Sequence, residues 1–219
     1  MAQKVAIVLF AQAPLLEQAG INLLPYFSAE KCFSLYEKYI EESAQNWEQE
    51  STHFWLTCEE AFQETLLLHA FPTVHGCKVA QGDMSEKMVA LTNYFLTYEE
   101  YQCVIFLFQP FTFISKTILA KIDQAFRRTS RSVLLLTSNN KQLDALAVSF
   151  PFSRLYEDIV WEKEDMIAQF KEHCKDAEIP CRSDVISDMV ITNPTIISDE
   201  QKLELQKSYP RLAKKFLAR

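Results

Sequence analysis

The sequence predicts an α/β fold, in which a mostly parallel sheet is flanked by helices on both faces within a single domain. Apolar runs of strand length alternate along the chain with longer segments whose apolar residues recur at helical spacing. This alternation is typical of βα units rather than of two separate domains. The 219 residues, 48% of them hydrophobic and 23% charged, are enough to bury one sizeable core.

The first half of the chain is predicted to start with a central strand, because residues 4–10 form a continuous apolar run. Thr57 and Glu60 have the spacing of a capping box, which predicts that a helix begins there. The predicted elements are, in order, strand 4–10, helix 29–49, strand 53–57, a helix ending near residue 70, and a short strand over 74–80.

The second half repeats the alternation and ends in helices. Asp83 with Glu86, and Ser198 with Gln201, are spaced as capping boxes at two helix starts. The predicted elements are a helix after residue 83, strand 102–108, helix 115–127, strands 132–137 and 143–150, helix 163–176 and a helical region over 198–219. We therefore expect a single domain over residues 1–219, with 198–219 as a C-terminal helical extension.

Charge and hydropathy exclude several classes of partner. The net charge of −7 and the pI near 5.2 argue against nucleic acid or an anionic membrane as a partner. The longest early apolar run, residues 5–10, is far shorter than the roughly 20 residues that a membrane helix needs. We expect a cytoplasmic protein that binds neither membrane nor nucleic acid.

The cysteines and histidines do not predict a metal site. The six cysteines include no Cys-x-x-Cys pair and are expected to be free thiols. Two groups could be drawn as metal clusters, but neither has a recognised ligand spacing: His69 with His75 and Cys77, and His173 with Cys174 and Cys181. The sequence therefore predicts no bound metal.

Glycine is scarce, which argues against a phosphate-binding loop. The chain has three glycines, whereas an average usage of about 7% would give roughly fifteen. Loops that bind phosphate through their backbone commonly cluster glycines, because the chain must adopt positive φ and approach the ligand closely. Without such a cluster, we expect no nucleotide cofactor held in this way.

Several strings, taken in order, resemble one family. The chain resembles the radical-SAM/selenodomain-associated transferases, small GT-A-type glycosyltransferase-like proteins related to nucleotide-diphospho-sugar transferases, from Val5 to about Leu203. The strings that carry the resemblance are VLFAQAP (8–14), LYEKYIEES (35–43), QGDMSEKM (81–88), YQCVIFLFQPFTFIS (101–115) and LYEDIVWE (155–162). It implies a GT-A-like, Rossmann-related sheet and a nucleotide-sugar cleft.

The chain departs from the family at four loops. Gln12 replaces a usual lysine, and no cation lies between Ala11 and Glu30. Where the family has two aspartates after a buried strand, this chain has Phe108, Gln109 and Pro110, with Phe113 three residues further on. The family's glutamate-aspartate-glycine-glycine string and its late aspartate-valine-aspartate correspond here to Asn139, Asn140, Lys141 and Gln142, and to Met189, Val190 and Ile191.

These departures together predict a loss of transferase chemistry. GT-A enzymes commonly hold a divalent cation with carboxylates, and that cation neutralises the leaving diphosphate. Proline and phenylalanine side chains cannot ligate magnesium or manganese. We also expect Phe108, Phe111 or Phe113 to fill the space that metal and diphosphate occupy in active relatives.

Two features of the family persist. Gln81, Gly82 and Asp83 keep the family's turn near the nucleotide, and Lys87 stands where an arginine is typical. A helix cap at Asp83 and a turn at Gly82 account for both residues without a nucleotide, and these are the more frequent roles of such residues. Trp161, which the resemblance places near the acceptor side, can likewise be a core aromatic.

The predicted function is a catalytically degenerate glycosyltransferase-like protein that acts as a protein-interaction module. We expect a protein partner, no cofactor, no metal, no catalytic residue and no binding of nucleotide sugar. The alternative is a metal-independent transferase that uses a nucleotide sugar or a related nucleotide. The candidate residues of a vestigial cleft are Gln12, Asp83, Lys87, Gln109, Asn139, Asn140 and Lys141.

Overall fold

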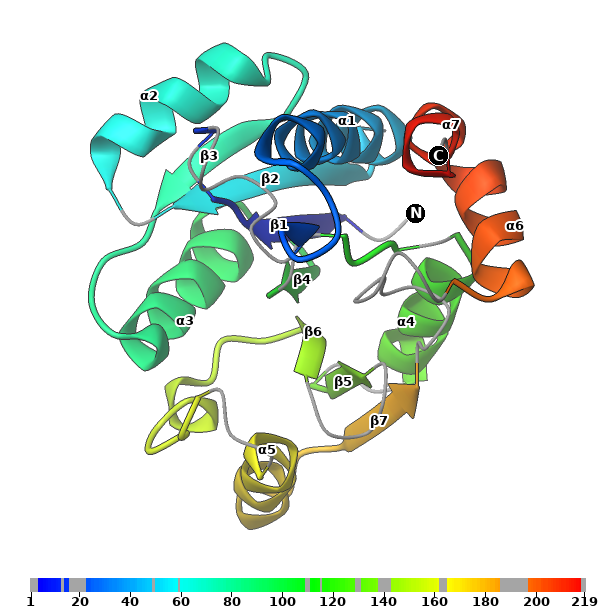
Figure 1. The fold of residues 1–219 in the computed structure, drawn as a ribbon. Coiled ribbons are helices and arrows are strands. Elements are labelled where there is room, and N and C mark those ends of the chain that lie inside the picture. The colour runs from blue at the N-terminus through cyan, green and yellow to red at the C-terminus, as the bar shows by residue number, and fades with distance from the viewer. Residues whose placement is uncertain are drawn as a thin grey trace.

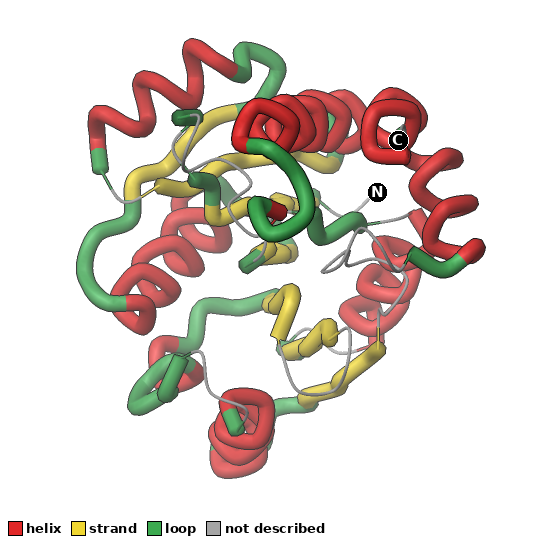
Figure 2. The backbone as a smooth tube through the Cα atoms, viewed as in Figure 1, coloured by secondary structure: helices red, strands yellow, loops and turns green. Residues whose placement is uncertain are grey.

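Strands and helices alternate along most of the chain (Figure 1 and Figure 2). The computed structural model describes residues 4–12, 14–15, 23–48, 50–58, 60–108, 111–114, 116–128, 131–137, 143–161, 165–185 and 197–217. The strands are β1 (Val5–Phe10), β2 (Thr52–Cys58), β3 (Gly76–Val79), β4 (Cys103–Leu107), β5 (Val133–Thr137), β6 (Leu143–Val148) and β7 (Cys181–Val185). The α-helices are α1 (Ala29–Trp47), α2 (Ala61–Ala70), α3 (Met84–Asn93), α4 (Lys116–Arg128), α5 (Met166–Asp176), α6 (Asp199–Ser208) and α7 (Pro210–Leu217).

The strands form one sheet in the order β3-β2-β1-β4-β6-β5-β7. β6 runs antiparallel to both of its neighbours, and the other pairs are parallel. The continuous apolar run of β1 has the position that its composition predicts, between β2 and β4. The expected α/β fold with a mostly parallel sheet is therefore confirmed.

Helices cover both faces of this sheet. Alternate residues of β1 divide between the two faces, with Ile7 and Leu9 on one side and Ala6 and Val8 on the other. The first side packs against α1, α4 and α7, and the second against α3 and α5 (Figure 1). Each helix is thus held by its apolar stripe, and the carboxyl ends of the parallel strands lie between the two layers.

The residues that cap the helices can be compared with the capping boxes that the sequence predicts. At the start of α3, the carboxylate of Asp83 accepts the Glu86 N–H and the carboxylate of Glu86 accepts the Asp83 N–H, as the capping box predicts. Thr57 is not a cap: it is the penultimate residue of β2, and its hydroxyl donates to the Lys78 carbonyl oxygen at 2.8 Å. Glu60 caps α2 instead, with Gln63 reaching back to its N–H.

β7 was not predicted from the sequence. Four of its five residues are exposed, so the segment lacks the apolar pattern by which a strand is recognised. It forms because β5 offers a parallel edge, along which Val133 pairs with Cys181 and Thr137 with Val185. Over the ranges given above, none of the helices has the length and apolar character needed to cross a membrane.

Candidate functional site

The carboxyl ends of β1, β2, β3 and β4 meet at one edge of the sheet, because these strands are parallel. In open α/β sheets, ligands bind at this edge. Backbone hydrogen bonds continue past the strand ends there: the Ala11 N–H donates to the Thr57 carbonyl oxygen at 2.9 Å, and the Ala80 N–H donates to the Cys58 carbonyl oxygen at 2.8 Å. This edge is therefore the candidate site that the fold provides.

Aromatic side chains line the ends of β1 and β4. The rings of Phe10 and Phe108 stack with centroids 5.5 Å apart and planes 25° apart. Trp161 contacts Phe108 at 5.9 Å and Phe170 of α5 at 5.8 Å. We call these four residues the aromatic row. It closes the end of β4 with apolar surface and joins it to the helix layer of α5.

The aromatic row is anchored to the start of α3. The Trp161 indole N–H donates to the Ser85 hydroxyl at 2.9 Å, and the ring is only partly buried. A tryptophan whose N–H is hydrogen-bonded and whose rings contact two other aromatic rings is held at the margin of the core. This supports the packing interpretation of Trp161 over a sugar-stacking one.

The three phenylalanines named in the sequence analysis do not lie together. Phe108 lies at the end of β4 in the aromatic row. Phe111 and Phe113 are buried in the other layer, against Tyr39 of α1, with ring centroids at 5.2 and 5.4 Å. The chain turns after β4 and carries these two rings toward Phe216 of α7 and Tyr209, so Phe108 is the one of the three that remains a candidate for filling the ligand space.

Gln12 lies in the loop after β1, where its backbone is held by a tyrosine. The Gln12 N–H donates to the Tyr36 hydroxyl oxygen at 2.8 Å, and that hydroxyl donates to the Gln12 carbonyl oxygen at 3.1 Å. Burial raises the pKa of Tyr36 well above its usual range, so the phenol stays neutral and can make both bonds. The backbone at Gln12 is thereby occupied within the protein.

Asp83 and Lys87 lie in the first turn of α3. The Glu86 N–H donates to Asp83 Oδ1 at 2.9 Å, and the Asp83 N–H donates to Glu86 Oε2 at 2.9 Å. Gly82 has φ of +96°, and a Cβ added there would lie 2.3 Å from Glu86 Oε2. Capping and the turn therefore account for Gly82 and Asp83, whose carboxylate remains exposed. Lys87 is partly buried one turn further on.

The other candidates fall outside the described ranges. Gln109, Asn139, Asn140 and Lys141 have no described placement. Their assignment to a vestigial cleft thus stays a prediction.

Sequence reasoning missed a buried carboxylate near this edge. Asp144 is 0% exposed, and its carbonyl oxygen accepts the Phe108 N–H at 3.1 Å. It is the extra residue of a β-bulge, since Leu136 pairs with Ala145 whereas Thr137 pairs with Leu143. Bulges of this kind re-aim side chains and occur often beside active sites. An apolar run that contains one aspartate gave no periodic signal by which to single it out.

The divalent cation implied by GT-A enzymes does not fit the aromatic row. Magnesium and manganese require oxygen ligands, usually carboxylates with near-octahedral geometry. The side chains placed at the ends of β1 and β4 are the rings of Phe10 and Phe108. We therefore derive no catalytic step through a metal at this edge.

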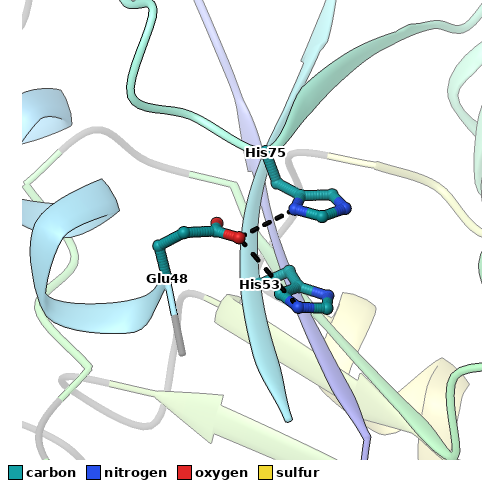
Figure 3. A group of neighbouring side chains, drawn as sticks. All are labelled: Glu48, His53 and His75. Atoms are coloured by element: carbon teal, nitrogen blue, oxygen red, sulfur yellow. Dashed lines mark hydrogen bonds and ion pairs between the residues drawn. The ribbon is translucent and has the colours of Figure 1, made fainter. Parts of the chain in front are cut away.

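In the first of the two groups considered as metal clusters, His69 and Cys77 have different neighbours, whereas in the second the thiols of Cys174 and Cys181 are hydrogen-bonded to each other. His69 is exposed on α2, whereas the thiol of Cys77 lies 3.5 Å from that of Cys58. A hydrogen bond with Cys174 lowers the pKa of Cys181, and Lys171 adds to this effect. His75 instead joins Glu48 and His53, the group drawn in Figure 3.

Comparison with solved structures identifies the fold. A protein described as a nucleotide-diphospho-sugar transferase from Desulfovibrio desulfuricans G20 superposes with a TM-score of 0.70 at 14% identity, over 98% of this chain and 99% of that one. The chain has a GT-A-like fold. Weaker matches are a CMP-2-keto-3-deoxy-manno-octonic acid synthetase in complex with CTP (TM-score 0.52, 12% identity, 94% and 100% of the chains) and a cytidylyltransferase from Leptospira borgpetersenii serovar Hardjo-bovis (0.51, 13%, 97% and 97%).

No family model and no curated protein matches the sequence. At such low identities, the structural likeness establishes the fold and leaves the activity open. Nucleotidyl and sugar transferases share this architecture, so the residues at the sheet edge must carry any argument about function.

Proposed function

We propose that this protein is a degenerate member of the radical-SAM/selenodomain-associated transferases, without metal-dependent transferase activity, that acts by binding another protein. The observation that carries the proposal is the aromatic row. It places stacked Phe10 and Phe108 where an open α/β sheet would hold its ligand. Together with the sequence departures at Gln12 and Phe108, it argues against binding of a diphosphate and a cation.

Nucleotide sugars with magnesium or manganese should not stabilise the protein measurably. A ligand at about one hundred times its dissociation constant adds roughly 2.7 kcal/mol to the free energy of unfolding, and each kcal/mol raises Tm by about 2–4 °C in a domain of this size. With affinity no better than millimolar, millimolar ligand should shift Tm by less than about 1–2 °C. The measurement is a thermal-shift panel of uridine, guanosine, cytidine and thymidine diphosphate sugars, with and without metal.

The surface proposed for the partner is the outer face of α2. Phe62 is 56% exposed and Leu66 is 40% exposed, and they stand one turn apart, with His69 continuing the same face. Leu67 alone among the residues of α2 is buried, so it holds the helix to the sheet. We call Phe62, Leu66 and His69 the α2 face. In Figure 1, α2 lies at the periphery, beyond the edge strand β3.

The occupant proposed for the α2 face is an amphipathic helix of another protein with a basic rim. Exposed apolar residues at i and i+4 are suited to a helix that presents its own apolar stripe. Glu60 and Glu64 flank the face, and the chain carries a net charge of −7, which favours a cationic partner.

The α2 face can be tested by comparing partners of matched variants. The double variant Phe62→Ser/Leu66→Ser should lose at least one partner by more than roughly tenfold, because apolar anchors at an interface centre each contribute more than 1 kcal/mol. Tyr98→Ser is the control, since Tyr98 is 78% exposed on another segment. The measurement is quantitative mass spectrometry of copurified proteins, followed by titration of the purified partner. Equal binding by all three proteins, or a partner without a basic amphipathic helix, would contradict the proposal.

Buried Asp144 supports a second candidate, the metal-independent transferase. The Asp144 carboxylate lies at a β-bulge beside the end of β4, and it would serve as a general base if substrate binding opens access to it. If this function holds, one nucleotide in the thermal-shift panel should raise Tm by several degrees. This rise in Tm should disappear in Asp83→Ala or Lys141→Ala. Asp144→Asn should abolish transferase activity with that nucleotide.

A further inference from the structure

A carboxylate and two imidazoles meet at the amino ends of β2 and β3, the edge of the sheet opposite the candidate site (Figure 3). Glu48 directly follows α1, His53 is the second residue of β2, and His75 immediately precedes β3. Glu48 Oε1 lies 2.7 Å from His75 Nδ1 and 4.0 Å from His53 Nε2. One ligand atom from each residue falls within 4.8 Å of the other two.

The backbone of β2 holds this group in place. The His75 N–H donates to the Phe54 carbonyl oxygen at 2.9 Å, and the Phe54 N–H donates to Glu48 Oε2 at 3.4 Å. The rings of His53 and His75 stack with centroids 4.1 Å apart and planes 9° apart. The parallel pairing of β2 with β3 thus brings together three residues that are up to 27 positions apart in the sequence.

Tyr101 supports His53 from behind. Its hydroxyl lies 2.6 Å from His53 Nδ1 and accepts the Trp55 indole N–H at 2.9 Å. Burial raises the pKa of Tyr101 to about 12, so the phenol stays neutral at physiological pH. With Nδ1 bonded to Tyr101, Nε2 is the nitrogen of His53 that faces Glu48. Metal-binding histidines are commonly oriented by such a bond to their other nitrogen.

We propose that Glu48, His53 and His75 form a binding site for a divalent transition metal of the zinc class. Two imidazoles and one carboxylate are a ligand set that zinc accepts, with a fourth position left for water. Bonds of about 2.0–2.1 Å in tetrahedral geometry place ligand atoms roughly 3.3–3.4 Å apart. The two distances from Glu48, 2.7 and 4.0 Å, bracket this value, so each of these two pairs needs to move by less than about 1 Å. The ligand nitrogens of His53 and His75 lie within 4.8 Å of each other.

The stacked rings must tilt for the site to close. A metal bound by an imidazole lies close to the plane of that ring, and two nearly parallel planes cannot share one metal. His75 is the ring that turns: its side chain is 36% exposed at a chain turn, whereas that of His53 is 16% exposed and bonded to Tyr101. Without metal, the stack and the Glu48 contact hold the same residues together.

The test is a titration of the purified, reduced full-length protein with Zn²⁺, in competition with a chromophoric chelator. We expect one tight equivalent in the wild type. Tyr101→Phe removes a partner of a ligand and should weaken Zn²⁺ affinity roughly 10- to 100-fold. His75→Ala and Glu48→Gln remove the ligands themselves and should weaken it by more than this. His69→Ala is the matched control, because His69 is an exposed histidine outside the group.

The absorption spectrum of bound Co²⁺ distinguishes a site at Glu48, His53 and His75 from metal bound by any of the six cysteines. A tetrahedral nitrogen and oxygen site gives visible absorption without the intense near-ultraviolet band of cobalt bound to thiolate. Zn²⁺ at about one hundred times its dissociation constant should also raise Tm by roughly 5–10 °C in the wild type and in His69→Ala. Absence of a tight equivalent, a thiolate spectrum, or unchanged affinity in His75→Ala and Glu48→Gln would each overturn the proposal. Folding of the variants is checked by their unfolding without metal.

Discussion

Replacing Phe111 with alanine should lower the free energy of unfolding by about 3–5 kcal/mol, the range observed when a buried aromatic ring is truncated. Phe111 is 0% exposed, and its ring packs between Tyr39 of α1 and Phe216 of α7. Its removal leaves a cavity where the segment after β4 meets both helices. In a domain of this size, the expected fall in Tm is roughly 6–20 °C, measured by thermal unfolding.

A second variant at the same position separates packing from backbone strain. Phe111 has φ of +65°, a conformation that favours glycine over other residues. Phe111→Gly should therefore be no less stable than Phe111→Ala, although it removes one more carbon. Phe62→Ala is the surface control, expected within about 0.5 kcal/mol of the wild type. A loss below about 1 kcal/mol in Phe111→Ala would contradict the packing described.

The second large effect is expected at Glu42, which joins α1 to α7. Glu42 is 4% exposed, and its two carboxylate oxygens accept the N–H groups of Arg211 and Leu212, each at 2.8 Å. These are N–H groups of the first turn of α7, which have no partner within that helix. Glu42→Ala should lower the free energy of unfolding by about 2–4 kcal/mol, because it removes two charge-assisted hydrogen bonds and the favourable charge at the helix start.

Chemical denaturation of matched variants checks this expectation. Glu41→Ala is the control: Glu41 is the neighbouring glutamate of α1, and its contact is a partly exposed ion pair with Lys38. It should change stability by less than about 1 kcal/mol. Glu42→Gln, which keeps one acceptor oxygen, should fall between Glu42→Ala and the wild type. If Glu41→Ala and Glu42→Ala destabilised the protein equally, the proposed role of Glu42 would be wrong.

The sequence was sufficient where the structure depends on neighbours within a few positions. The apolar run of β1 and the apolar spacing of α1 placed both elements close to their observed bounds. The caps at Asp83 and Ser198 were readable because a capping box needs only a residue and its partner three positions later. At Thr57 the same rule failed, because two overlapping patterns were possible and strand pairing with β3 took precedence.

Only the tertiary structure revealed the roles of Asp144, Glu42 and the group of Glu48, His53 and His75. The apolar segment of β6 could be recognised, but its antiparallel direction and the bulge at Asp144 arise from pairing with β4 and β5. Glu42 resembles any glutamate on a helix until α7, some 170 residues later, is placed against it. Glu48, His53 and His75 have no recognisable spacing, since parallel pairing joins strands through a long crossover. Local periodicity thus determined the elements and the fold class, whereas contacts between distant segments depend on how the sheet is ordered, which no short pattern encodes.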